Sequence, residues 1–289
     1  MQEPSQKKEK VTISYIMEKK RSQEKIIMLT AYDYPMARIL EQTGCDIILV
    51  GDSLGMVVLG YPDTLSVTME EMLHHTKAVS RACERAMVVA DMPYLSYHLS
   101  KEEALLNAGR FIKEARAQAV KIEGGRKREQ IVRHLIDAEI PVMGHIGLTP
   151  QSLHNMGGFR VQGKSMQRAM ELMEDALSLQ EAGAFALVLE GIPSELAKLI
   201  TAKISIPTIG IGAGPHCDGQ VLVTYDLIGL YDGFRPKFVR CYMELKEELK
   251  ETFQHFYKDV KQGRFPSEKE SYHLPEDVAQ AIKEKLGKN

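Results

Sequence analysis

Short apolar runs recur along this chain, and longer segments with apolar residues at helical spacing separate them. Continuous apolar runs are typical of strands that are buried on both faces, as in parallel sheets. Because strand and helix alternate seven or eight times, the pattern favours a closed (β/α)8 TIM barrel, of the α/β class, over an open doubly wound sheet. Seven runs predict strands and an eighth is weaker, in the order 26–31, 45–51, 87–91, 119–123, 141–146, 184–190, 207–211 and, as the weaker one, 221–224.

Local start and stop signals place helices between these strands. Gly44 follows a helical pattern and is a C-terminal stop, while Thr68 precedes one and is a candidate N-cap. Ser100 is a second candidate, and Glu103 three residues later predicts a capping box. The predicted helices therefore have ordinary capping chemistry.

The two ends of the chain differ from the repeating pattern. Residues 11–23 combine apolar and charged positions at roughly helical spacing, and this helix is expected to cap one end of the barrel. We expect one domain over 1–289, with a polar leader and capping helix at 1–24 and a C-terminal helical extension at 237–289. We expect this extension to pack on the barrel or to form an assembly surface, rather than to fold as a second domain.

Composition excludes several kinds of partner. With 37 basic and 39 acidic residues the net charge is −2, so no field draws the chain to nucleic acid or to anionic lipid. No run approaches the roughly 18 apolar residues of a membrane span, and no apolar signal region follows the N-terminal charges, so we expect a cytoplasmic protein. Four scattered cysteines without a CxxC pair predict reduced thiols rather than a zinc site or a disulfide framework: Cys45, Cys83, Cys217 and Cys241.

Charged side chains stand at the C-terminal tips of four predicted strands. In a (β/α)8 barrel these tips converge on one rim, where catalytic groups from distant parts of the sequence meet. Lys121 and Glu123 lie two residues apart on one strand, so both face the barrel interior. An interior ion pair is the alternative for these two alone. Asp52 and Asp91 add two more carboxylates at neighbouring strand tips, and their mutual repulsion is more than the single charge of Lys121 can neutralise. This excess of negative charge favours a bound divalent cation.

The donor set predicts the kind of metal and reaction. Carboxylates without thiolates favour Mg²⁺ or Mn²⁺, which bind through one or two protein carboxylates and water. Such an ion chelated by a 2-keto acid stabilises an enolate, and Lys121 is expected to hold negative charge of the substrate. Glu190, on a later strand, is a candidate general base, with a salt-bridged rim residue as the alternative. His145 is expected to hydrogen-bond the enolate or the substrate carboxylate, unless it is a satisfied core histidine.

Three loop motifs carry weaker signals. Ser53 lies in a GDSLG turn whose N–H groups and hydroxyl can meet a carboxylate, and GDSLG is not a nucleophile elbow. The glycine-rich segment 210–220 lies where many barrels bind phosphate, but no Walker lysine follows. The loop 147–165, with Gly157 and Gly158, predicts a mobile lid or else an ordered surface loop.

Seven ordered segments together resemble the ketopantoate hydroxymethyltransferase family, within the phosphoenolpyruvate mutase and isocitrate lyase superfamily. The likeness spans about residues 11–260 and shows no departure at the charged positions. It is carried by MLTAYDYPMA, VGDSLGMVVLGYPDTLSVTMEEM, VADMPYLSY, VKIEGG, PVMGHIGLTPQS, LEGIP and IGIGAGPHCDGQVLV.

The resemblance implies an activity, cofactors and a set of roles. The family transfers a hydroxymethyl group from 5,10-methylenetetrahydrofolate to 3-methyl-2-oxobutanoate, giving 2-dehydropantoate in the first committed step toward pantothenate and coenzyme A. By the same resemblance, Asp52, Asp91 and Glu123 are ligands of one Mg²⁺ per subunit. Ser53 and Lys121 bind the keto acid together with Asp52 and Asp91, and Glu190 is the proton acceptor. Members form homodecamers of two pentamer rings, which would give the C-terminal helices a role.

The sequence is also compatible with two other functions. A Mg²⁺-dependent lyase or mutase would stabilise the same enolate without folate, but the Lys-Lys-Cys-Gly-His loop of those lyases is absent from the sequence. A non-catalytic barrel that binds a keto acid, or an assembly component, is the alternative from another class.

Overall fold

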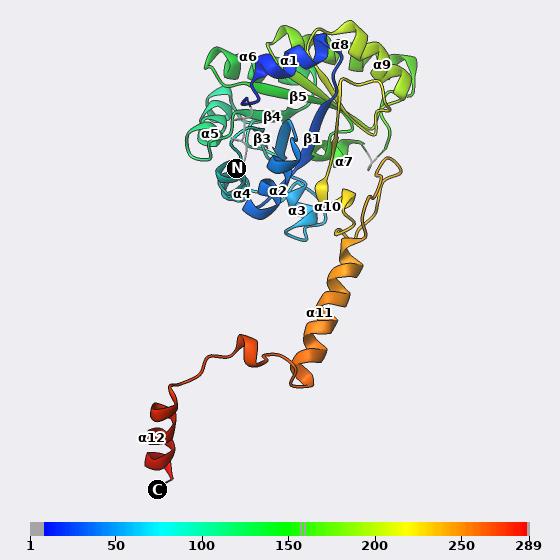
Figure 1. Cartoon of the computed structure of the whole chain (residues 1–289). Helices are drawn as coiled ribbons and strands as arrows, with labels where there is room; N and C mark the ends of the chain where they lie inside the picture. Colours follow the sequence, from blue (N-terminus) through cyan, green and yellow to red (C-terminus); the bar gives the residue numbers. More distant parts are fainter. Residues whose placement is uncertain (1–8, 157, 159, 288–289) are drawn as a thin grey trace.

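The chain forms a closed barrel of eight parallel strands (Figure 1). The computed structural model describes residues 9–156, 158 and 160–287. The strands pair in sequence order, and β8 closes the barrel against β1. They are β1 Ile26–Thr30, β2 Ile47–Val50, β3 Met87–Asp91, β4 Ala119–Glu123, β5 Val142–Gly147, β6 Ala186–Glu190, β7 Thr208–Ile211 and β8 Gly219–Leu222. The predicted (β/α)8 fold is thus confirmed.

The eighth strand differs in position from the prediction. It was expected near 221–224 but begins at Gly219, which pairs with Ile26. A Cβ at Gly219 would lie 2.5 Å from the Ile26 carbonyl oxygen, so only glycine permits this close pairing. The apolar run alone gave a boundary two residues too late, because Val223 already serves as the N-cap of the next helix.

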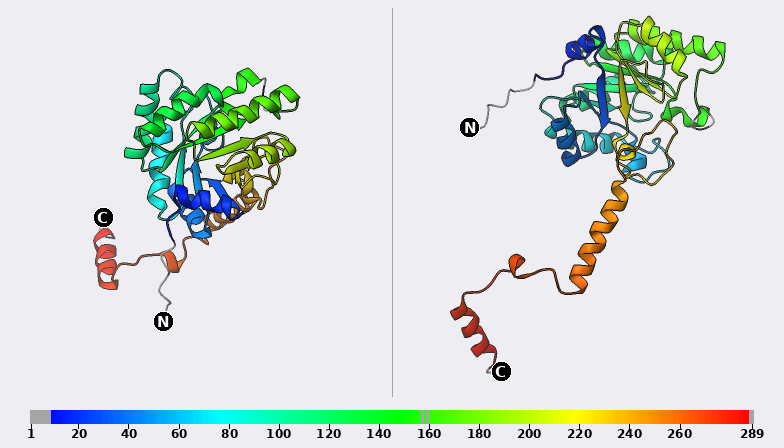
Figure 2. Two further views of the ribbon diagram at one scale, coloured as in Figure 1. Left: turned by 90° about the horizontal axis from the view of Figure 1, so that it is seen from above. Right: turned by 45° about the vertical axis from the view of Figure 1, so that its right-hand side comes forward.

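Helices surround the barrel and fill the connections (Figure 2). The predicted N-cap Thr68 is confirmed and forms a complete capping box with Glu71 at the start of α4. Ser100 accepts the Glu103 N–H at the start of α5, which is half of the predicted capping box; the bond back from the Glu103 side chain is not among those of the described residues. Gly44 ends α2 in the left-handed region at φ 84°. The helices are α1 Ile13–Arg21, α2 Tyr34–Thr43, α3 Leu54–Val57, α4 Met69–Ala82, α5 Lys101–Lys113, α6 Glu129–Asp137, α7 Leu153–Met156, α8 Met166–Glu181, α9 Ser194–Lys203, α10 Thr224–Leu227, α11 Leu245–Lys261 and α12 Glu276–Leu286, with 3₁₀ turns at η1 Arg126–Arg128, η2 Pro150–Ser152 and η3 Glu268–Glu270.

Alternation along the strands divides the apolar core into two clusters. Outward-facing residues such as Val120 and Ile122 pack against the helices. Inward-facing residues such as Met87 and Val89 fill the barrel, and Val11 and Ile16 from the region of α1 join this inner cluster. The helix α1 therefore covers the N-terminal end of the barrel, opposite the rim on which the strands end.

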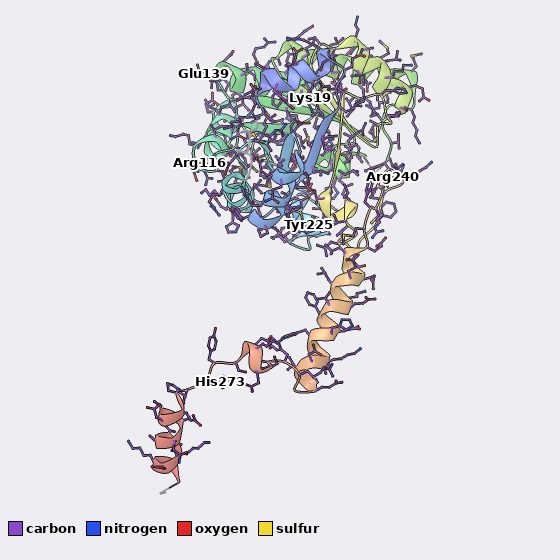
Figure 3. All side chains as sticks on the ribbon, in the orientation of Figure 1. Lys19, Arg116, Glu139, Tyr225, Arg240 and His273 are labelled. Atoms are coloured by element: carbon purple, nitrogen blue, oxygen red, sulfur yellow. The ribbon has the colours of Figure 1, made fainter. Side chains whose placement is uncertain are left out.

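The C-terminal helices extend away from the barrel (Figures 1 and 3). Neither α11 nor α12 contains a buried residue, and His273 lies in the segment between them, far from the barrel. The segment before α11 still contacts the barrel part of the chain, since the Tyr242 N–H donates to the Leu227 carbonyl at 2.8 Å, but α11 and α12 bury no residue against it. No helix in the described part of the chain has the length and apolar character to cross a membrane.

Candidate active site

The same alternation that fills the barrel brings titratable side chains to its C-terminal rim. Asp91 follows Met87 and Val89 at spacing two, so its side chain points inward like theirs. Strand register then sets neighbours side by side, because Asp91 pairs with Lys121 and Glu123 pairs with His145. Five inward-facing residues form the resulting cluster: Asp91, Lys121, Glu123, His145 and Glu190.

Lys121 is held by a buried ion pair. Its Nζ lies 2.8 Å from Asp91 Oδ1, and both side chains are almost fully buried. The other oxygen of Asp91 accepts the backbone N–H of Asp52 at 3.1 Å. Both oxygens of the buried Asp91 carboxylate are therefore in contact with a donor group, Oδ1 with the Lys121 ammonium and Oδ2 with the Asp52 N–H.

His145 links the two glutamates. Its Nδ1 lies 3.4 Å from Glu123 Oε1, and its Nε2 lies 3.2 Å from Glu190 Oε2. Burial and the charge of Lys121 oppose protonation, but the contacts with the two glutamates outweigh them and raise the pKa of His145 to about 9. The raised pKa favours the protonated ring, which faces a carboxylate at each nitrogen, and Lys121 Nζ also lies 3.3 Å from Nδ1.

Gln151 is a residue of the cluster that the sequence analysis did not single out. Its Nε2 donates to Asp52 Oδ2 at 2.8 Å and to the Met92 carbonyl at 2.9 Å, and its backbone N–H donates to Glu123 Oε2 at 3.0 Å. Tyr97 OH donates to Gln151 Oε1 at 2.6 Å. The side-chain amide and the backbone N–H of this one residue thus fix two of the predicted metal ligands relative to one another. The only sequence signal is its position after Thr-Pro, directly beyond the tip of β5.

Ser53 lies beside the carboxylates on the turn after β2. Its Oγ is 2.9 Å from Tyr32 OH, a second residue that the sequence analysis missed. A Cβ at Gly51 would come within 2.9 Å of Ser53 Oγ, so a side chain there would displace the Ser53 hydroxyl from its present position. The GDSLG turn therefore brings a hydroxyl next to the buried acids.

Charge in the cluster is unbalanced. Burial raises the pKa of Asp52 well above its usual range, and repulsion by Asp91 and Glu123 adds to this; burial also raises the pKa of Asp91 despite Lys121. For Glu123, His145 and Lys121 outweigh burial and lower the pKa. Burial alone would lower the pKa of Lys121, but the surrounding carboxylates raise it, so its ammonium stays charged. Four carboxyl groups thus face two cations, and a divalent cation would favour the charged forms of Asp52 and Asp91, which burial and mutual repulsion disfavour.

The predicted metal ligands lie near one another but are not arranged as a complete coordination site. Among the residues that the structure describes, no group of three or more His, Cys, Asp or Glu side chains is arranged to hold a metal ion. The chemistry of the donors nevertheless fits a hard cation, since the predicted ligands are all carboxylates. Because Mg²⁺ retains several waters, it needs only one or two of these oxygens directly.

Comparison with known proteins shows the family of this chain. The model of the ketopantoate hydroxymethyltransferase family matches residues 10–268. The chain belongs to this family. A 3-methyl-2-oxobutanoate hydroxymethyltransferase from Syntrophomonas wolfei is 56% identical over 269 residues, covering 93% of this chain and 98% of the relative. One from Dehalococcoides mccartyi is 55% identical over 274 residues, covering 95% and 97%.

As a member of the ketopantoate hydroxymethyltransferase family, the chain is an enzyme, a transferase, so the non-catalytic alternative is wrong. Solved structures confirm the fold at low identity. A 2,3-dimethylmalate lyase of the PEP mutase and isocitrate lyase superfamily aligns with TM-score 0.59 and 15% identity, covering 96% of this chain and 98% of that one. A phosphonopyruvate hydrolase in complex with oxalate and Mg²⁺ aligns with TM-score 0.59 and 11% identity, covering 95% and 96%.

The segments 147–165 and 210–220, which were candidates for a lid and a phosphate site, have different surroundings in the structure. The segment 147–165 begins with the turn η2 and the helix α7, and Gln151 anchors it to the carboxylates, while Gly157 lies outside the described residues. In the segment 210–220, a Cβ at Gly214 would meet Ser194 Oγ at 2.2 Å, so a protein side chain lies against this turn. The lid and phosphate interpretations stay predictions.

Proposed function

We propose that this enzyme transfers a hydroxymethyl group from 5,10-methylenetetrahydrofolate to 3-methyl-2-oxobutanoate, giving 2-dehydropantoate, the first committed step toward pantothenate and coenzyme A. The names of its relatives support the ketopantoate-forming reaction. The observation that carries the proposal is the buried cluster in which carboxylates outnumber cations around Lys121. That charge pattern is suited to a 2-keto acid bound beside a divalent cation.

The keto acid is proposed to bind between Lys121 and the turn at Ser53. The ammonium remains charged, because the carboxylates raise its pKa, and it offers a cation to the substrate oxygens. The Ser53 hydroxyl, oriented by Tyr32 OH, donates to the substrate carboxylate. Asp52 and Asp91 complete this face of the pocket.

Asp52, Asp91 and Glu123 are proposed to hold one Mg²⁺, directly or through water. When bound, this ion supplies a Lewis acid that stabilises negative charge on the keto oxygen. The chain's own part is to keep the three carboxylates in register. Gln151 does this by bonding to Asp52 and Glu123, and the Asp52 N–H does it by bonding to Asp91.

Glu190 is proposed to take the C3 proton of the keto acid. It stands at the tip of β6 with a side chain 15% exposed, whereas that of Glu123 is 4% exposed. His145 holds Glu190 in place from β5 and supports the negative charge that develops on the substrate. The C3 carbanion then attacks the methylene carbon of the donor. One water supplies the hydroxyl, and tetrahydrofolate leaves.

Turnover is expected to need both the folate donor and Mg²⁺. We expect 2-dehydropantoate to form from 3-methyl-2-oxobutanoate only with 5,10-methylenetetrahydrofolate present, and chelation of divalent cations to abolish it. Product is measured by mass spectrometry, with readdition of Mg²⁺ as the control. Conversion of the keto acid without folate would support the lyase or mutase alternative instead.

The C-terminal extension is proposed to join copies of this chain, in a homodecamer by family resemblance. On α11, the apolar residues Phe253, Phe256, Tyr257 and Val260 follow spacing three and four on one exposed face. We expect light scattering to give a mass several times that of the 32.5 kDa chain. The double substitution Phe253→Glu and Phe256→Glu is expected to lower this mass, and Tyr272→Glu, on a fully exposed residue, is the control. A monomer in the unmodified protein would contradict the proposal.

A further inference from the structure

A basic cleft of about 470 Å³ opens beside the candidate active site. It lies between the segment that follows β3 and the segment that follows β4, on the same rim of the barrel. Among the described residues that line it, none is acidic, and those that matter here are Tyr97, His98, Lys101, Arg126, Lys127 and Arg128. A cleft of one charge sign raises the local concentration of ligands of the other sign.

Most of the positive charge in the basic cleft is unpaired. Arg126 is already neutralised, because its Nη1 lies 2.7 Å from Glu174 Oε2 and its Nε lies 3.6 Å from Asp175 Oδ1. In the described part of the chain, no carboxylate lies within ion-pair distance of three other cations, Lys101, Lys127 and Arg128. These three charges are available to an anionic ligand.

Aromatic rings form one wall of the basic cleft. The rings of Tyr97 and His98 lie 4.2 Å apart at 40°, and Tyr94 meets His98 edge-on at 5.2 Å. The Arg128 guanidinium lies over the Tyr97 ring at 5.5 Å. Burial and the Arg128 charge lower the pKa of His98 to about 4, so this ring is neutral at physiological pH. Its Nδ1 is buried and has no hydrogen-bond partner among the described residues.

Tyr97 separates the basic cleft from the active site. Its ring lines the cleft, while its hydroxyl donates to Gln151 Oε1 at 2.6 Å and accepts the Glu123 N–H at 3.2 Å. A ligand with its reacting carbon at the carboxylate cluster would have to pass Tyr97 to reach the cleft, because this one side chain contacts both. Such a ligand would be aromatic where it passes the rings and anionic beyond them.

We propose that the basic cleft binds the anionic tail of the one-carbon donor. The aminobenzoyl ring of the folate lies along the aromatic wall, and the carboxylates of its glutamate residues contact Lys101, Lys127 and Arg128. This inference rests on the folate donor proposed above and adds the site of its tail. Because each further glutamate adds one carboxylate, the cleft favours donors with longer tails.

The test compares donors that differ only in tail length. For the full-length enzyme, we expect the KM of the triglutamate form of 5,10-methylenetetrahydrofolate to be about tenfold below that of the monoglutamate form, with kcat unchanged. The double substitution Lys101→Gln and Lys127→Gln is expected to reduce this ratio to about threefold or less. Both lysines are exposed, so the fold should not change. Binding of the triglutamate form, followed by calorimetry, should weaken in parallel and depend on salt.

A matched control removes the same charge elsewhere. Lys113→Gln with Lys203→Gln alters two exposed lysines outside the cleft and is expected to leave the ratio as it is. Equal KM values for both donors in the unmodified enzyme would overturn the tail site while leaving the folate reaction intact. Absence of turnover with either donor would instead reject the proposed function. Tripolyphosphate tests the other source of charge, since its binding at Lys101 and Lys127 without any effect of tail length would assign the cleft to a free anion.

Discussion

Replacing Glu190 by Gln is expected to slow the exchange of the C3 proton of 3-methyl-2-oxobutanoate with solvent by about 10² to 10⁴. Glutamine has the same shape and keeps an oxygen near His145 Nε2, which lies 3.2 Å from Glu190 Oε2. It has no basic oxygen to accept a proton from carbon. Exchange is measured by NMR in D₂O with Mg²⁺ and without a folate donor, so that only the proton-transfer step is observed.

The binding of keto acid separates this role from a structural one. We expect Glu190→Gln to bind the keto acid with an affinity close to that of the unmodified enzyme, because Lys121 and Asp91 are unchanged. Glu195→Gln makes the same chemical change on an exposed residue in the first turn of α9 and is the matched control. Unchanged exchange in Glu190→Gln would remove this residue from the base role.

The barrel and most of the cluster could be predicted because strand alternation determines both. Apolar residues at spacing two fill the barrel, and the next inward position on β3 is Asp91, while Lys121 and Glu123 take the corresponding positions on β4. Parallel strands in sequence order then place these tips on one rim. The same rule explains why His145 joins them from β5.

Contacts set by loops could not be predicted in this way. Gln151 reaches Asp52 across 99 positions of sequence, and Tyr97 reaches Gln151 across 54. Neither contact follows from a period of two or 3.6, because the chain direction after each strand tip depends on turns such as η2. The metal set illustrates the same limit. Gln151 contacts both Asp52 and Glu123, but no group of three or more His, Cys, Asp or Glu side chains among the described residues is arranged to hold a metal ion, so the metal site stays a prediction.

The C-terminal extension shows a different limit of the pattern. Its helical period correctly predicts α11, but the period does not say what covers the apolar face. Phe253, Phe256 and Tyr257 are exposed on a helix that extends away from the barrel (Figure 1). Apolar spacing identifies a face that favours burial, and only the position of the helix shows that its own barrel does not bury it.

Replacing Lys121 by Met is expected to lower the free energy of unfolding by about 3–5 kcal/mol at neutral pH and to abolish keto-acid binding. Methionine fills a similar volume but leaves Asp91 buried without the ammonium that lies 2.8 Å away. Burial already raises the pKa of Asp91, and the loss of the cation raises it further, so the folded variant binds a proton that the unfolded chain releases. The stability deficit should therefore shrink as pH falls and grow as pH rises through the raised pKa.

Urea unfolding at fixed protein concentration without divalent cations measures this, and Lys113→Met, on an exposed residue of α5, is the control. The double variant Lys121→Met with Asp91→Asn is expected to recover most of the stability but no keto-acid binding. Unaltered stability in Lys121→Met would show that this buried ion pair does not hold the cluster together.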